Sequence, residues 1–193
     1  MTVTFSGASG AAGGVQQDYA LVHAALLEGQ LSDIRDNTIG TYVNETNAVL
    51  AFGNVVVFNS AGTVANSAKT IAATGDTVQG VNVLTYVDET ALDTNSRPGV
   101  KDEQVLNVAS QGAVAVFVHG TVTPATAVRV IHTATGVQYA GQFRSAALSG
   151  KTALLANARY LTSVTGSGLA VVELNGPSFT LTPDITDRRP SNV

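Results

Sequence analysis

A strict alternation of residue types marks the middle of the chain. The residues on one face of this run are Val114, Val116 and Val118, and those on the other are Ala115, Phe117 and His119. A period of two, with β-branched residues on one face, is typical of a β-strand rather than of a helix. Gly120 and Pro124 then predict a turn, and the valines at 128 and 130 predict a returning strand. We therefore expect a buried central hairpin between Gln111 and His132.

Short apolar or alternating runs lie on both sides of this hairpin. They cover residues 48–59, 78–87, 104–109, 136–143, 158–164 and 168–175. Gly53 predicts a bend in the first run, and the tripeptide T-G-S between the last two predicts a closing hairpin. Many short strands joined by turns indicate an all-β domain, a small β-barrel or sandwich, over residues 48–176.

Residues 15–28 carry the one convincing helical pattern. Their apolar stripe consists of Val15, Tyr19, Val22 and Leu26, at the spacing that puts side chains on one helix face. Gly29 predicts the end of this helix. A free helix of this length is marginal in water, so the stripe is expected to bind a partner surface.

The segments around the β region are expected to lie outside it. Residues 1–14 are rich in Gly, Ala and Ser, and residues 30–46 are polar, which indicates an extended connector. Residues 1–47 are thus predicted to be an extended N-terminal arm that carries one short helix. Residues 177–193 contain three prolines and are predicted to be a C-terminal tail.

Composition points to assembly rather than to a free monomer. Charged residues make up 12% of the chain, about half the usual share for a soluble domain. A surface so poor in charge indicates contact with other protein, and we expect a homo-oligomer, with a trimer favoured over a dimer. The net charge is −4 and no basic run occurs, so no nucleic-acid partner is expected.

No targeting or membrane segment is evident in the pattern of the chain. The N-terminus lacks the basic start and apolar core of a signal peptide, and no run approaches the roughly 18 apolar residues of a membrane span. We expect synthesis in a cytoplasm and no membrane partner.

No catalytic constellation or cofactor motif appears, so we expect neither enzymatic activity nor a cofactor. The chain has no cysteine, which excludes a thiol nucleophile and a thiolate metal site. Two weak metal candidates remain. One is the pair His119 and His132 across the predicted hairpin, and the other is an acidic loop with Asp88, Glu89, Asp93 and Asp102. Surface histidines and a solvated loop are the favoured interpretations, and a carboxylate pair from distant segments stays open.

The order of motifs resembles that of a known family. It runs A-F-G-N-V-V-V-F-N (51–59), V-Q-G-V-N-V-L (78–84), R-P-G-V-K-D-E-Q-V-L-N-V-A-S-Q-G-A-V-A-V-F-V (97–118), T-P-A-T-A-V-R-V (123–130) and N-A-R-Y-L-T-S-V-T-G-S-G-L-A-V-V-E-L-N (157–175). Over residues 48–176 this resembles the structural cement, or capsid decoration, proteins of tailed bacteriophages. The resemblance implies a non-enzymatic β-barrel protein, made in the host cytoplasm, that binds the outer surface of the phage head. There it would clamp adjacent subunits of the major capsid protein and stabilise the shell.

Two other classes of function fit the sequence less well. A head fibre or adhesin-like β-sandwich would bind a host glycan or receptor, but sugar stacking favours exposed aromatics, and the chain has no Trp and only 6% aromatic residues. An enzyme ranks third for want of a catalytic constellation.

Overall fold

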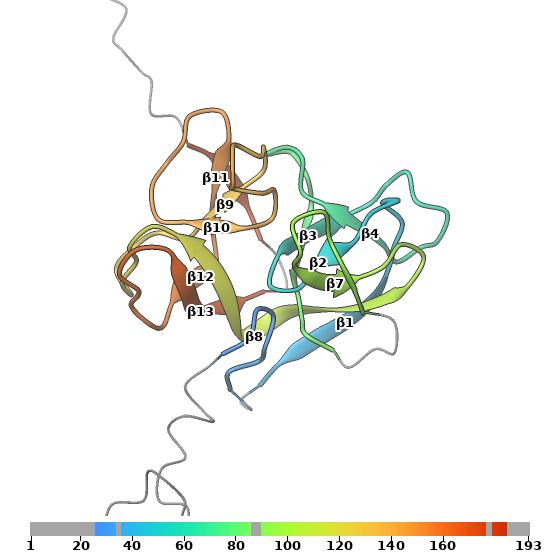
Figure 1. The fold of residues 1–193 in the computed structure, drawn as a ribbon, viewed down its shortest axis with the longest axis horizontal. Coiled ribbons are helices and arrows are strands. Elements are labelled where there is room, and N and C mark those ends of the chain that lie inside the picture. The colour runs from blue at the N-terminus through green and yellow to red at the C-terminus, as the bar shows by residue number, and fades with distance from the viewer. Residues whose placement is uncertain (1–25, 34–35, 86–89, 177–178, 185–193) are drawn as a thin grey trace, which may run out of the picture.

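The structure, a computed structural model, describes residues 26–33, 36–85, 90–176 and 179–184. Within these residues the chain forms β-strands and no helix (Figure 1). The strands are β1 (Thr38–Asn44), β2 (Leu50–Ala51), β3 (Val55–Phe58), β4 (Ser67–Thr70), β5 (Val78–Asn82), β6 (Thr90–Leu92), β7 (Pro98–Val100), β8 (Val105–His119), β9 (Arg129–Ile131), β10 (Phe143–Arg144), β11 (Thr152–Leu155), β12 (Ala158–Tyr160), β13 (Gly168–Asn175) and β14 (Leu181–Pro183). The predicted all-β class is confirmed.

Five strands close into a barrel. The hydrogen-bonded order β1-β4-β3-β5-β8 returns to its start because β8 also pairs with β1. The β1–β4 pair is parallel, and the other pairs in this ring are antiparallel. A separate three-stranded sheet, in the order β2-β7-β6, contributes residues to the barrel core. Closure of this kind removes most of the free sheet edges that an open β-sheet would expose.

The second half of the chain extends the sheet from β8. On one side the order continues β8-β10-β9-β11-β14, and β13 pairs with β8 and carries β12 on its other edge. The long β8 thus runs from the barrel into this second region (Figure 1).

A β-bulge in the middle of β8 allows one strand to serve both regions. Ile39 pairs with Ala109, but the next residue back along β1, Thr38, pairs with Gln111, so Ser110 is an extra residue. An extra residue turns every later side chain to the opposite face. Before the bulge, Leu106 and Val108 therefore point into the barrel, whereas after it the even-numbered residues pack on the outside.

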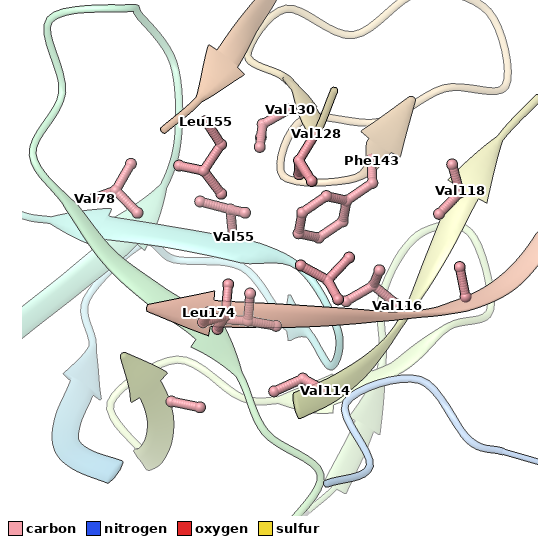
Figure 2. Packing of buried hydrophobic residues seen from close by; sticks show 14 of the residues in the cluster. Val55, Val78, Val114, Val116, Val118, Val128, Val130, Phe143, Leu155 and Leu174 are labelled. Carbon is pink, nitrogen blue, oxygen red and sulfur yellow. The ribbon is translucent and has the colours of Figure 1, made fainter. Parts of the chain in front are cut away.

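Two hydrophobic cores result from this arrangement. The barrel core contains buried residues from β3, β4 and β8 together with the small sheet: Leu50, Phe52, Val56, Ala68, Val100, Leu106 and Val108. The larger core lies between the second region and the side of β3 and β5 that faces away from the barrel interior. Figure 2 shows Val55, Val116 and Phe143 in this core. β3 separates the two cores, because Val55 and Val57 point to one side and Val56 to the other.

The closing hairpin and the bend at Gly53 are confirmed. β12 pairs with β13 in the register Ala158 to Leu174, and Gly53 separates β2 from β3 with a positive φ of 72°. The predicted alternation in β8 is also confirmed, since Val114, Val116 and Val118 are fully buried.

The prediction of a central hairpin from Gln111 to His132 is wrong. β9 does not pair with β8, because β10 lies between them and Phe143 aligns with Val118 on one side and Val130 on the other. The predicted turn leaves the sheet instead, and its Val122 forms a bridge with Val164.

The predicted N-terminal arm is only partly separate from the barrel. Most of the predicted helix, residues 15–25, lies outside the described residues, but its last residues, 26–28, are not helical. The polar segment predicted as a connector supplies β1, which pairs with β8 along six residues. A boundary at residue 47 would therefore cut through the barrel. In the predicted tail, residues 181–183 form β14 at the edge of the sheet, a position where Pro183 is tolerated.

The bulge makes Gly112 sensitive to substitution. Its φ is +125°, and an added Cβ would lie 1.9 Å from Oδ1 of Asn37. We expect Gly112→Ala to lower the free energy of unfolding by more than the roughly 1–2 kcal/mol of left-handed strain alone. Gly166→Ala is the matched control, since Gly166 also has positive φ but no atom within 4 Å of an added Cβ. Chemical denaturation measures both, and equal effects would contradict the role of the bulge.

Candidate partner-binding surface

The predicted partner-binding stripe is largely outside the described residues. Val15, Tyr19 and Val22 lie outside the described residues. Leu26 is half-buried, and Leu27 is 58% exposed. From there the chain enters the sheet: the Gly29 carbonyl accepts from Leu84, and its N–H donates to Ala115 of β8. The described chain therefore joins the barrel at Gly29, between Ala115 of β8 and Leu84, which follows β5.

An uncharged, partly apolar face covers the outside of β1 and β8. Since Tyr42 packs against the barrel core, its neighbours Thr41 and Val43 point outward. The register places Val43 beside Val105, Thr41 beside Asn107 and Ile39 beside Ala109. Ile39 is 44% and Val105 is 50% exposed. We call Ile39, Thr41, Val43, Val105 and Asn107 the outer face.

Hydrogen bonds hold the polar residues of the outer face in place. The Thr41 hydroxyl lies 3.4 Å from Oδ1 of Asn107, and Nδ2 of Asn107 donates to the Thr85 hydroxyl at 3.2 Å. The face is therefore uncharged and preorganised, which suits contact with another protein.

This face was not predicted from the sequence. Ile39 lay in the supposed connector and Val105 at the end of a short strand. The alternation of Ile39, Thr41 and Val43 with Tyr42 was the available signal, but the surrounding polar residues obscured it.

The two histidines have separate partners. Nε2 of His119 lies 2.8 Å from Oε1 of Gln142, while Nδ1 of His132 lies 3.0 Å from the Thr133 hydroxyl. Because β10 separates β8 from β9, the hairpin that would have made these histidines cross-strand neighbours does not form.

Of the acidic loop, the two described residues, Asp93 and Asp102, have separate partners. Asp88 and Glu89 lie outside the described residues. Asp93 accepts hydrogen bonds within its own turn, whereas Asp102 accepts the N–H groups of Thr46 and Asn47, at 2.9 and 2.8 Å. Among the described residues no group of three or more His, Asp or Glu side chains is placed to hold a metal ion.

A charged junction joins the barrel to the second region. The Arg97 guanidinium lies 2.8 Å from Asp93, donates to Asn54 at 3.1 Å and stacks over the ring of Tyr139 at 5.1 Å. Glu28 is close enough to feel these charges, but burial dominates and raises the pKa of its carboxyl. Since Arg97 has a carboxylate, an amide and an aromatic ring as partners, we interpret the junction as a structural fastener.

Glu45 holds the loop that follows β3. Its carboxylate accepts the Thr63 hydroxyl and the Thr63 backbone N–H. The Ser67 and Thr63 hydroxyl groups beside it, together with the backbone N–H groups of Thr63 and Val64, lower the pKa of the Glu45 carboxyl to about 2.

The described residues contain no helix that is long and apolar enough to cross a membrane.

Comparison with known proteins gives one family and one fold. The family model described as structural cement protein (E217 gp24/Pam3 gp6) matches residues 15–175. No curated protein matches the chain. A chain from the solved structure "The capsid of Myoviridae Phage XM1" is similar with a TM-score of 0.55 and 18% identity, over 78% of this chain and 90% of that chain. At this identity the likeness shows a shared fold.

The lowered pKa of Glu45 predicts a specific pH dependence. Its carboxylate stabilises the folded state fully above the ordinary glutamate pKa of 4.5, and this contribution is lost as the pH falls toward the lowered pKa of about 2. We expect Glu45→Gln to lower the free energy of unfolding near neutral pH and to flatten its decline in acid. Denaturant titrations across this pH range measure the free energy of unfolding. Thr63→Ala is expected to lower that free energy as well, because it removes a donor to the Glu45 carboxylate. Superimposable curves for Glu45→Gln and wild type would refute the assignment.

The separate partners of the two histidines, and of Asp93 and Asp102, predict that the fold does not depend on a metal ion. Adding a strong chelator is expected to leave the melting temperature unchanged. A fall on chelation, reversed by Ca²⁺ or Zn²⁺, would contradict this.

Proposed function

The chain belongs to the structural cement protein family, so it is a capsid structural protein of a phage, and we propose that it binds the outer surface of the head and clamps adjacent subunits of the major capsid protein. The family match over residues 15–175 carries this proposal. The fold shared with a chain of a phage capsid structure supports it. Synthesis in the host cytoplasm and the absence of enzymatic turnover are part of the proposal.

The surface chemistry of the barrel is compatible with a clamp. A clamp must present uncharged, ordered contact area, because desolvating unpaired charges weakens a protein interface. The outer face supplies such area on β1 and β8, where Ile39 and Val105 are exposed. Tight barrel closure and the Arg97 junction would let the protein transmit force between subunits without unfolding locally.

We propose that the residues before Leu26 act as a tether. Val15, Tyr19, Val22 and Leu26 would be its partner-binding contacts, across a subunit boundary of the assembled head. Several copies acting together need only weak individual contacts, because multivalency multiplies their effect. A homotrimer would match the local three-fold positions of a capsid lattice, with a dimer as the second possibility.

Binding to purified heads tests the function. We expect electron microscopy to show added density on undecorated heads incubated with the protein, and decorated heads to withstand heating better than bare ones. Heads that stay bare at saturating protein would refute the proposal.

A truncation tests the tether. Since residues 29–32 and β1 bond to β8, the deletion must stop before Leu26. We expect deletion of residues 1–25 to change the melting temperature of the free protein little but to weaken its retention on washed heads. The double variant Tyr19→Ser, Val22→Ser should weaken retention as well, while Gln17→Ser, off the stripe, should not. Equal retention of all variants would exclude the tether.

Light scattering on the free protein tests the oligomer. A mass three times that of the 19.7 kDa chain is expected. A monomer at all accessible concentrations would contradict the trimer.

A further inference from the structure

Among the residues that the structure describes, β4 covers only one end of the β1 edge that faces it. β4 pairs with β1 only at Val43 and Asn44, whereas β8 pairs with β1 from Thr38 to Val43. The Val43 N–H points to the β4 side, where it donates to Asn66, and that of Asn44 points to the β8 side, where it donates to Gln104. Backbone groups alternate between the two edges in an antiparallel ladder.

The unpaired groups follow from this alternation. Ile39 and Thr41 share the orientation of Val43, so their N–H and C=O groups face the open edge. Among the described residues, no strand pairs with them there. This leaves four backbone groups in a row that match those of an added strand.

This edge also lacks the features that usually protect a free strand. Natural edges carry charges, prolines or bulges that prevent pairing with other chains. β14 has Pro183, and β12 has Arg159 in an ion pair with Glu173. The open part of β1 reads T-I-G-T, without charge or proline, and its Ile39 is exposed on the adjoining outer face. The strand thus has an open edge and an apolar surface at the same place.

A short segment outside the described residues has a sequence that suits this edge. Residues 2–5 read T-V-T-F, in which β-branched and aromatic residues alternate without charge or proline. The first charged side chain of the sequence is Asp18, so this segment would bring no charged side chain to an uncharged edge. Between Phe5 and Leu26 the chain can span up to about 70 Å when extended, which is enough to reach another copy.

We propose that residues 2–5 of one copy add as a strand to the open edge of β1 in a second copy. The added strand would hydrogen-bond to Ile39 and Thr41 and bury part of Ile39 under Val3 or Phe5. This is β-strand addition, in which main-chain bonds supply affinity and alternate side chains supply specificity. The inference rests on the proposed tether and names the surface on which its far end docks.

Cysteine cross-linking tests the pairing, because the natural chain has no cysteine. Copies with Val3→Cys and copies with Ile39→Cys are purified separately, mixed and oxidised, both free in solution and on heads. We expect a disulfide-linked dimer of one copy of each kind. Val137→Cys is the control acceptor, because Val137 is 76% exposed but lies in a turn.

Blocking the edge gives a second readout. Thr41→Pro removes an N–H that faces the open edge and spares the ladder with β8. Introduced into the Ile39→Cys copy, it is expected to reduce cross-linking about five- to tenfold, the effect of losing one hydrogen bond. Thr41→Ser keeps the N–H and should leave the yield unchanged. Melting curves of all variants confirm that the acceptor copies are folded.

The outcomes separate this inference from the proposed function. A cross-link no stronger than with the Val137→Cys control overturns the inference. If the protein decorates heads but no cross-link forms, the strand pairing is refuted and the proposed function stands. Failure to decorate heads refutes the proposed function, whereas the cross-link in free solution still decides the pairing.

Discussion

The extra residue at Ser110 is the constraint on which the rest of the structure depends. A regular strand offers one face to one core, and β8 must supply two. Because they are five positions apart, Ala109 and Val114 would lie on opposite faces of an unbroken strand, yet both belong to the larger core. The bulge reconciles them, and Gly112 gives the backbone the conformation that it needs there. Barrel closure by β1 and docking of β13 both follow from this one irregularity.

The two regions of the molecule consequently cannot be separated. They share β8 as a strand and β3 as a wall, and the Arg97 junction ties the small sheet to the loop that carries Tyr139. Low charge fits the same picture. The ion pairs that Arg97 forms with Asp93 and Arg129 forms with Asp184 are intramolecular and largely shielded from solvent. These charges therefore contribute little to the surface that other proteins could contact.

Local patterns predicted local structure well. The alternation around Val116, the turn between β12 and β13 and the bend at Gly53 were all evident from a few residues. What failed was pairing over distance. β10 has only two residues, too few to leave a pattern, and its insertion beside β8 displaced the expected hairpin. β1 resembled a connector because Asn44, a buried polar residue, is satisfied by the carbonyls of Ala48 and Val100. The outer face depends on register, which periodicity alone does not set, and the predicted apolar stripe remains a hypothesis.

The position of β8 in the chain also bears on how the protein is made. Its earliest partner, β1, precedes it by more than sixty residues, and its last, β13, ends at Asn175. On a ribosome that adds about 5–20 residues per second, this apolar strand waits several seconds for its final neighbour. β8 therefore completes its hydrogen bonding only after Asn175 has been made, and the nascent chain, with few charges to keep it apart from its copies, is prone to aggregate in that interval.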